Sequence, residues 1–176
     1  MSGCPFECEG CIVKNLQNPK TGKKYKDFYT NIKSYLSKID GITFSGGEPL
    51  YQSKELFLLL NKLPKKLDKM LYTGYTKEEL KKEQLKCYNL FDLVVEGRFE
   101  IDKIGDFLWR GSSNQIFSSP TKKYKSSIKE LYSKKSAGLE IKVDKNEIAF
   151  YGIPTNRNEI KQIDQQLSNH LLIKHL

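Results

Sequence analysis

Three cysteines within the first eleven residues constrain this chain more than any other feature. Cys4, Cys8 and Cys11 leave three residues between the first pair and two between the second. Three thiolates on one short loop can each take one iron corner of a cubane 4Fe-4S cluster, because soft sulfur ligands suit such clusters. The fourth iron would then have no protein ligand. An iron with an open coordination position is a place for chemistry, so the loop predicts a reactive cluster and not merely a structural one.

Length and composition predict a single soluble domain. The chain has 176 residues and 38% hydrophobic residues, which is enough for one core. We expect one domain over 1–176, with a motif-bearing part at 1–125 and a C-terminal part at 126–176. No run approaches the roughly 18 to 20 apolar residues of a membrane span, and no secretory signal is visible. Clustered thiols suit a reducing cytoplasm, where they usually bind metal.

The formal charge of +9 raises the question of a nucleic-acid partner. Only three of the 30 basic residues are arginines, whereas phosphate and base-edge recognition favours the arginine fork. We therefore expect no nucleic-acid partner and no membrane partner. A solvated, lysine-rich surface explains the charge, and a basic patch that docks an acidic redox donor is the alternative.

The hydrophobic pattern alternates short strands with helices. Helical periodicity marks three segments, at 27–39, 53–63 and 76–86. Strand-forming runs mark three others, at 42–45, 69–73 and 91–96. Thr76 followed by Glu79 predicts a capping box at the start of the third helix. This alternation is typical of βα units with a parallel sheet.

The alternation of short strands and helices ends at about residue 105. Residues 105–125 are rich in Gly, Ser, Pro and Lys and predict a long loop over the active face. Residues 139–143 and 147–151 flank Asp-Lys-Asn and predict a β-hairpin. A closing helix is expected over 158–170.

A resemblance to a known superfamily follows from the motifs. The cysteine loop is followed by Gly46-Gly47-Glu48-Pro49 directly after a predicted strand, a combination that resembles the radical S-adenosylmethionine enzymes. Three further motifs recur in this order in the activating proteins of anaerobic ribonucleotide reductases. They are Leu-Tyr-Thr-Gly-Tyr at 71–75, Val-Glu-Gly-Arg-Phe at 95–99 and Trp-Arg-Gly-Ser-Ser-Asn-Gln at 109–115. The matches extend from Gly3 to about Gln115.

The resemblance implies a fold. Its members have an incomplete open (β/α) barrel, here of about five to six mainly parallel strands, and this chain would add a C-terminal β-hairpin and helix. Members usually have a strand before the cysteine loop, whereas only Met1, Ser2 and Gly3 precede Cys4 in this sequence. We therefore expect one sheet edge to be open, or to be covered by the C-terminal hairpin and helix.

The resemblance also implies a site. It assigns Cys4, Cys8 and Cys11 to the cluster, whose open iron binds the amino and carboxylate groups of S-adenosylmethionine. It assigns six residues to S-adenosylmethionine: Gly46, Gly47, Glu48, Pro49, Thr73 and Gly74. The two adjacent glycines would let backbone groups approach the methionine moiety, and Glu48 would accept from its ammonium group.

The implied activity is radical chemistry on a protein. One electron from the reduced cluster cleaves S-adenosylmethionine, and the resulting 5'-deoxyadenosyl radical abstracts hydrogen from a glycine of the anaerobic ribonucleotide reductase. A small donor such as flavodoxin or ferredoxin would supply the electron. Within the loop over the active face, Trp109 is expected to be a core anchor, and Arg110 to meet a carboxylate or dock the partner.

Two alternatives remain open at this point. A radical enzyme of the same fold would act on another glycyl-radical enzyme, a peptide or a small molecule. A non-enzymatic module would bind zinc, or a purely structural cluster, with Cys87, His170 or His175 as the fourth ligand. Outside that alternative, Cys87 is interpreted as an incidental thiol and the two histidines as solvated side chains.

Overall fold

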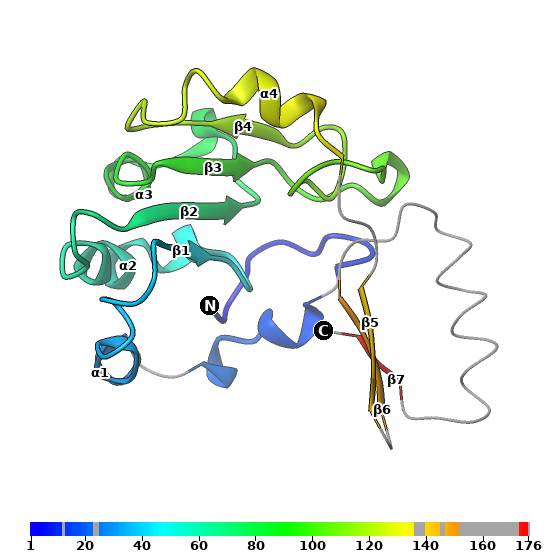
Figure 1. Ribbon diagram of the computed structural model, residues 1–176, viewed down its shortest axis with the longest axis horizontal. Coiled ribbons are helices and arrows are strands. Elements are labelled where there is room, and N and C mark those ends of the chain that lie inside the picture. Colours follow the sequence, from blue (N-terminus) through cyan, green and yellow to red (C-terminus); the bar gives the residue numbers. More distant parts are fainter. Residues whose placement is uncertain (12, 23–24, 136–139, 145–146, 152–172, 176) are drawn as a thin grey trace.

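A four-stranded open sheet forms the centre of the molecule (Figure 1). The structure, a computed structural model, describes residues 1–11, 13–22, 25–135, 140–144, 147–151 and 173–175. The strands lie in the order β1 (Gly41–Phe44), β2 (Asp68–Thr73), β3 (Leu93–Glu96) and β4 (Ile116–Ser118). The first three are parallel, and β4 is antiparallel to β3. The α/β class and the open sheet are confirmed, but the described residues give four strands in this sheet, so five to six are not confirmed.

Two βα units connect the parallel strands. Helix α2 (Ser53–Leu60) links β1 to β2, and α3 (Lys82–Tyr88) links β2 to β3. The register places Phe44 opposite Leu71, and Leu71 opposite Val94. Because parallel strands need such crossovers, the carboxyl ends of β1, β2 and β3 meet at one edge of the sheet.

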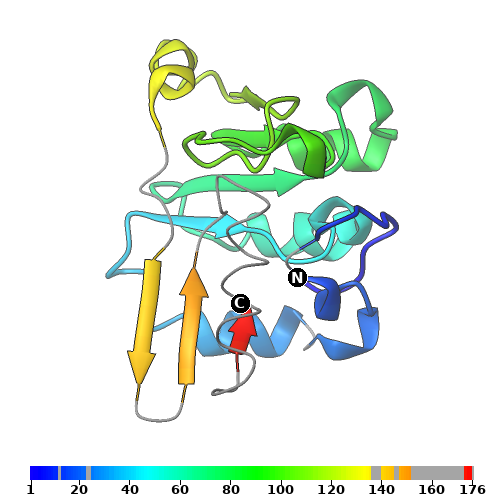
Figure 2. The same cartoon turned by 90° about the vertical axis from the view of Figure 1, so that its right-hand side faces the viewer.

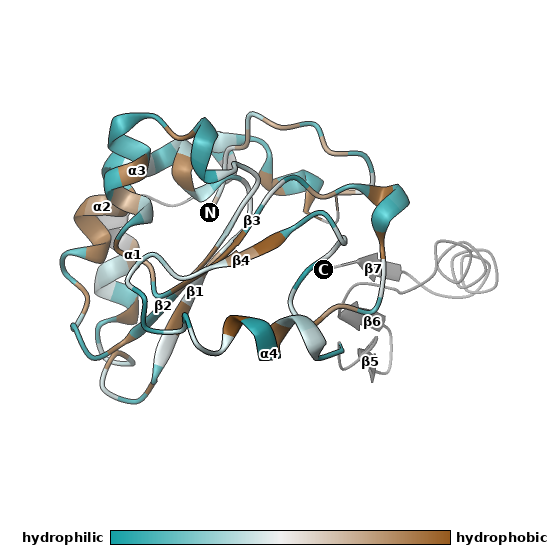
Figure 3. Ribbon diagram, turned by 90° about the horizontal axis from the view of Figure 1, so that it is seen from above, coloured by the Kyte–Doolittle hydropathy of each residue, from teal (hydrophilic) through white to brown (hydrophobic). Residues whose placement is uncertain are grey.

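The main core lies between the sheet and the helices on one of its faces. Leu50, Leu56, Leu71 and Val94 are completely buried there, and α1 (Tyr25–Ile32) adds partly buried side chains. Burying a side chain of this size stabilises the fold by about 1.5–3 kcal/mol. Figure 3 shows the same division, with hydrophobic strands and a hydrophobic α2 beside the mainly hydrophilic α3.

A smaller cluster covers part of the other face. Leu93, Val95 and Phe117 pack there against side chains of α4 (Ile128–Ser133). The Tyr132 hydroxyl accepts a hydrogen bond from the backbone N–H of Phe117 at 2.8 Å. This contact attaches α4 to the edge strand β4. The rest of that face leads into the cavity described below.

The first predicted helix is shorter than its periodicity indicated. Helix α1 ends at Ile32, and the chain continues to residue 38 in tight turns. Tyr35, Leu36 and Lys38 donate their N–H groups to carbonyls three residues earlier, which is tighter than the α-helical pattern. These turns still bury Leu36, which is 5% exposed. The apolar periodicity thus located Leu36 correctly in the core, but Tyr35 of the same pattern is 61% exposed.

The third predicted helix is interrupted. The capping box of Thr76 and Glu79 is confirmed, but it starts only a 3-10 turn at Lys77–Glu79. The chain is extended at Leu80, and α3 then begins at Lys82. The side chain of Gln84 accepts from the N–H of Lys81 at 3.0 Å, which provides a second helix start. Other 3-10 turns lie at Lys14–Leu16, Pro19–Thr21, Pro49–Gln52 and Ile101–Lys103.

The C-terminal part forms a second sheet. The predicted hairpin is confirmed as β5 (Glu140–Asp144) and β6 (Glu147–Tyr151), and β7 (Ile173–His175) pairs parallel to β6. Figures 1 and 2 agree that these strands run across the direction of the main strands. The hairpin pairs with β7 and not with β1, so it does not extend the main sheet. The expectation that the hairpin and the closing helix cover an open sheet edge stays a prediction. The predicted closing helix over 158–170 lies outside the described residues.

Candidate functional site

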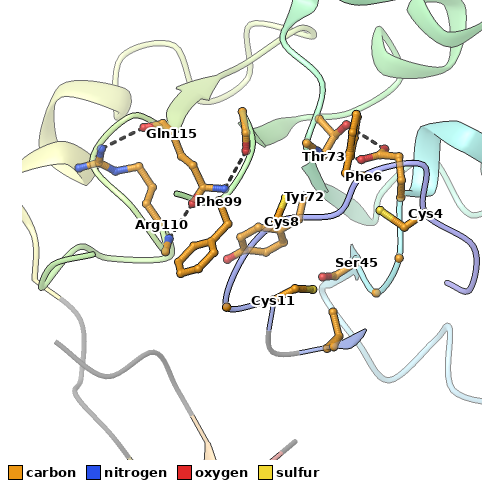
Figure 4. Close-up of a pocket in the computed structure, with 18 of the residues that line it drawn as sticks. Cys4, Phe6, Cys8, Cys11, Ser45, Tyr72, Thr73, Phe99, Arg110 and Gln115 are labelled. Carbon is orange, nitrogen blue, oxygen red and sulfur yellow. Dashed lines mark hydrogen bonds between the residues drawn. The ribbon is translucent and has the colours of Figure 1, made fainter. Parts of the chain in front are cut away.

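A cavity of about 440 Å³ lies at the carboxyl edge of the parallel strands. Its lining includes all three cysteines of the N-terminal loop, together with residues 45–48 after β1 and residues 72–74 at the end of β2. Figure 4 shows the three cysteine side chains around this cavity, with Arg110 and Gln115 at its other end. Ligands of open α/β sheets bind at this edge, so the fold brings the sequence motifs together at the expected place.

Backbone hydrogen bonds hold the cysteine loop against the end of β1. The N–H of Glu48 donates to the carbonyl of Gly3 at 2.8 Å, and the N–H of Cys4 donates to the carbonyl of Gln17 at 3.1 Å. A Cβ atom at Gly47 would overlap the Gly3 carbonyl oxygen. The glycine at this position therefore admits the loop that carries the cysteines, in addition to the role toward a ligand that the sequence predicted.

Glu48 is a buried carboxylate with three hydrogen-bond donors. Its Oε1 accepts from Leu50 N–H and from the Thr73 hydroxyl, both at 2.8 Å, and its Oε2 accepts from Gly74 N–H at 2.8 Å. Burial raises the pKa of Glu48, and these three donors act in the opposite direction. A carboxylate oxygen can accept two hydrogen bonds, and Oε2 accepts only one in the structure. Oε2 can therefore accept a second hydrogen bond from a ligand in the cavity.

The three thiols of the loop are half-buried in this cavity. Burial raises the pKa values of Cys4 and Cys8, and each thiolate gains a backbone donor, from Phe6 and Phe99 respectively. Soft sulfur donors on one short loop beside an open cavity fit a 4Fe-4S cluster, which binds each cysteine to a different iron. A bound cluster would be held by Cys4, Cys8 and Cys11.

The zinc alternative requires a fourth ligand beside the three cysteines. Within the described part of the chain, no three His, Cys, Asp or Glu side chains surround a common point as ligands of a single ion. Zinc needs its ligands gathered at about 2.0–2.3 Å from one centre. Cys87, on α3, is completely buried in the main core and does not line the cavity. This position agrees with its interpretation as an incidental thiol. The side chains of His170 and His175 lie outside the described residues.

The segment from 105 to 115 forms the other end of the cavity. Gln115 connects this segment to the turn after β3, because its Oε1 accepts from Gly111 N–H at 2.7 Å and its Nε2 donates to the carbonyl of Gly97 at 2.9 Å. The predicted loop over the active face is thus confirmed, although the strand β4 within 105–125 was missed. Ile116 and Phe117 were the available signal for that strand, since both residue types favour strands.

Trp109 of this segment differs from expectation, whereas the expected role of Arg110 toward a carboxylate or the partner stays a prediction. Trp109 was predicted to be a core anchor, but its side chain is 47% exposed and its backbone is left-handed, with φ of 56°. Arg110 is 7% exposed and donates to the carbonyls of Ser113 and Gln115 at 3.2 and 3.0 Å. Its guanidinium also stacks on aromatic rings, at 4.7 Å from the centroid of Phe107. The buried position of Arg110 makes it a support of the cavity wall.

Tyr72 is a cavity residue that sequence reasoning did not single out. It lies on β2, and its ring contacts the smaller core cluster while it also lines the cavity (Figure 4). Burial raises the pKa of Tyr72 to about 12, so its phenol stays protonated at neutral pH. The signal was its position directly before Thr73, at the carboxyl end of a strand.

The predicted ligand residues therefore fall into two groups. Gly46, Gly47, Glu48, Thr73 and Gly74 line the cavity together with the cysteines. Pro49 is fully buried, begins a 3-10 turn and does not line the cavity. This position suits a residue that fixes the backbone directly after Glu48. Direct contact of Pro49 with a ligand stays a prediction.

Comparison with known proteins agrees with this site. Residues 1–118 match the family described as a 4Fe-4S single cluster domain, so the class of protein is an iron–sulfur protein of the single-cluster type. The cysteine loop and the whole cavity lie within the matched residues.

Curated relatives narrow the class further. The chain is 35% identical over 130 residues to the anaerobic ribonucleoside-triphosphate reductase-activating protein of Enterobacteria phage T4, covering 69% of this chain and 81% of that protein. It is 34% and 31% identical over 128 residues to the proteins of the same name from Salmonella typhi and Escherichia coli K12, covering 66% of this chain and 82% of each. No solved structure matches the chain. The chain belongs to the family of anaerobic ribonucleoside-triphosphate reductase-activating proteins.

None of the helices among the described residues is long and apolar enough to cross a bilayer.

Proposed function

We propose that this chain is an activating enzyme that reductively cleaves S-adenosylmethionine at a 4Fe-4S cluster and generates a glycyl radical on the anaerobic ribonucleotide reductase. One observation carries the proposal. The three thiols of the cysteine loop and the Gly46–Glu48 segment line the same cavity, although more than thirty residues separate them in the sequence. The names of the relatives supply the proposed partner.

The residues of the cavity have distinct proposed roles. Cys4, Cys8 and Cys11 would each hold one iron of the cluster, and the iron without a cysteine would be available to the amino and carboxylate groups of S-adenosylmethionine. When bound, the cluster supplies the electron that cleaves a C–S bond to give methionine and a 5'-deoxyadenosyl radical. Glu48 would accept from an N–H of the amino group of the methionine moiety through Oε2, its oxygen with only one donor in the structure.

The lining of the cavity would limit side reactions. Carbon-rich side chains contribute much of the cavity lining, among them Phe99, Phe107 and Trp109. An apolar wall excludes water from the site and so limits side reactions with solvent. The volume of about 440 Å³ falls in the usual range of roughly 300–1,000 Å³ for small-molecule sites. The Gly46–Gly47 pair and Gly74 are the small residues that border the proposed methionine position.

The open edge of the sheet suits a protein substrate, because a polypeptide segment must reach the radical. The larger incomplete barrel of about five to six strands, with SAM bound at its carboxyl edge, is part of this proposal. So are a small flavodoxin-like or ferredoxin-like electron donor and a cytoplasmic location, in which the half-buried thiols stay reduced.

Anaerobic reconstitution tests the proposal. Wild-type protein loaded with iron and sulfide should contain about four irons per chain, as a cubane requires, and should release 5'-deoxyadenosine from S-adenosylmethionine when dithionite is added. Cys4→Ala should lose both properties, whereas Cys87→Ala should keep them, because Cys87 is remote from the cavity. Cofactor cleavage retained by Cys4→Ala, or absent from the iron-loaded wild type, would contradict the proposal.

The target requires a separate measurement. Iron-loaded protein, S-adenosylmethionine and reductant should produce a glycyl-radical electron paramagnetic resonance signal on the anaerobic ribonucleotide reductase. Pyruvate formate-lyase in the same assay serves as the competing target. A signal on pyruvate formate-lyase alone would reassign the substrate without changing the cofactor chemistry.

A further inference from the structure

The Phe6 ring connects the cysteine loop to the rest of the site. Phe6 lies between Cys4 and Cys8, and its ring meets Tyr75 edge-on, with the centroids 4.7 Å apart and an interplanar angle of 68°. A Cβ atom at Gly74 would come within 2.7 Å of the same ring. Gly74 is thus small enough to admit the ring. The Phe6 ring thus packs the cysteine loop against the turn after β2 (Figure 4).

Arg98 covers the Phe6 ring from another element. Its guanidinium carbon lies 4.5 Å from the Phe6 ring centroid, a cation–π distance. Arg98 follows β3, so Phe6 is held by residues that come directly after two neighbouring strands. The sequence separation between Phe6 and Arg98 exceeds ninety residues, and no local pattern predicts their contact.

The position of Arg98 is itself fixed. Its Nη2 donates to Glu79 Oε1 at 2.8 Å, and its carbonyl accepts from Asn114 Nδ2 at 2.8 Å. The other oxygen of Glu79 accepts from Thr76 N–H at 2.8 Å, in the capping box described above. The guanidinium therefore has an oriented anchor, although its side chain is 45% exposed.

The positive charge of Arg98 also acts on the thiol loop. The Phe6 ring that the guanidinium covers lies two residues from Cys4 and two from Cys8, so the charge lies against the loop that carries the thiols. A fixed cation at this position would favour the more negative, reduced form of a cluster bound to Cys8. Net charge and hydrogen bonds at the sulfurs are among the factors that set cluster reduction potentials.

We infer that Arg98 is a positioning residue for the cysteine loop: its guanidinium clamps Phe6 against Tyr75 and places a fixed positive charge against this loop. The clamp slows loss of the cluster, and the charge raises the cluster's reduction potential. The inference rests on the proposed function, because it requires that the loop binds a cluster.

The test compares three anaerobically reconstituted variants with the wild-type holoprotein. Arg98→Gln removes the charge, Arg98→Lys keeps the charge without the planar stacking group, and Lys62→Gln is the matched control. Lys62 also places a cation over an aromatic ring, 5.7 Å from the centroid of Tyr29, but remote from the cavity. Two quantities are measured: the rate of iron release to a chelator, and the cluster reduction potential from an anaerobic titration followed by absorbance.

Arg98→Gln should release iron roughly three- to ten-fold faster than wild type, the factor expected for loss of a partly desolvated cation–π contact. Its reduction potential should fall. Arg98→Lys should keep a potential close to wild type and release iron at an intermediate rate, and Lys62→Gln should match wild type in both. An Arg98→Gln protein that matches Lys62→Gln in release rate, or that keeps the wild-type potential, overturns the inference.

A second variant covers the case in which Arg98→Gln does not fold. Phe6→Leu leaves the Arg98–Glu79 ion pair intact and removes only the clamped ring. It should release iron faster while its potential changes less than that of Arg98→Gln. Release at the wild-type rate would overturn the clamp. Failure of the wild-type protein to bind a cluster would contradict the proposed function instead, so the two failures are distinguishable.

Discussion

The hydroxyl of Thr73 donates a 2.8 Å hydrogen bond to the carboxylate of Glu48, although the two residues come from the ends of different strands. The same hydroxyl oxygen accepts from Tyr75 N–H at 3.2 Å. Thr73 therefore links the turn after β2 to the Gly46–Pro49 segment after β1. This link fixes the orientation of the one acidic side chain that the proposed function directs toward the cofactor.

Thr73→Val tests this link. The substitution keeps the shape of the side chain but leaves a buried carboxylate with one donor fewer, so we expect the free energy of unfolding to fall by about 1–3 kcal/mol. Urea denaturation of the apoprotein measures the change. Thr43→Val on the exposed face of β1 is the control and should change it by less than about 0.5 kcal/mol. Equal effects of the two variants would show that the hydrogen bond contributes nothing.

Gly74→Ala tests the close approach of Phe6. The added Cβ would lie 2.7 Å from the ring, so the ring or the loop must shift, at a cost of about 1–3 kcal/mol in unfolding free energy. Adding Phe6→Leu to this variant should recover part of the loss, because the shorter side chain removes the overlap. Thermal or urea unfolding of the single and double variants gives the comparison, and a double variant no better than Gly74→Ala would refute the steric explanation.

Thiol alkylation distinguishes the four cysteines. In the native apoprotein, iodoacetamide should modify Cys4, Cys8 and Cys11, which are half-buried, and spare Cys87, which is completely buried. Burial also raises the pKa of Cys87 to about 12, so at pH 8 this side chain stays a protonated thiol. The thiolate is the form that reacts with iodoacetamide. Peptide mass spectrometry should find the Cys87 adduct only in denaturant. Its modification at the rate of the other three would place Cys87 outside the core.

Asp68 gives a pH-dependent prediction at the opposite edge of the sheet. Hydrogen bonds from Lys123 and then Tyr124 lower the pKa of Asp68 below its usual 3.8. A carboxylate with a lowered folded-state pKa stabilises the fold above its unfolded pKa, and the contribution is lost as the pH falls through the folded pKa. Asp68→Asn should therefore lower the free energy of unfolding at pH 7 by at most about 1 kcal/mol, because the pair is exposed.

The difference between Asp68→Asn and wild type should shrink once the pH falls below 3.8, and it should also shrink in high salt, which screens exposed charges. Chemical denaturation across a pH series measures it. A difference that stays constant into strong acid would assign the effect of the substitution to something other than the carboxylate charge.

Local sequence signals predicted much of the fold. Short apolar runs located β1, β2, β3 and the β5–β6 hairpin, because strands and turns depend on neighbouring residues. Periodicity was less accurate at helix ends. The segment from 33 to 38 keeps its apolar spacing but forms tight turns, and Gln84 starts a new helix where a continuous one was predicted. β4 was missed because three residues paired to β3 leave almost no local pattern.

The sequence by itself determined the spacing of the three cysteines, the glycine-rich segment after β1 and the family, because these depend on residue identity and covalent spacing. Only the tertiary structure decided how the parts meet. It showed that Thr73 and Gly74 donate to Glu48, that Phe6 lies under Arg98, and that Trp109 is exposed while Arg110 is buried. Such contacts join residues far apart in the chain, and they depend on strand register and side-chain packing, which no local pattern encodes.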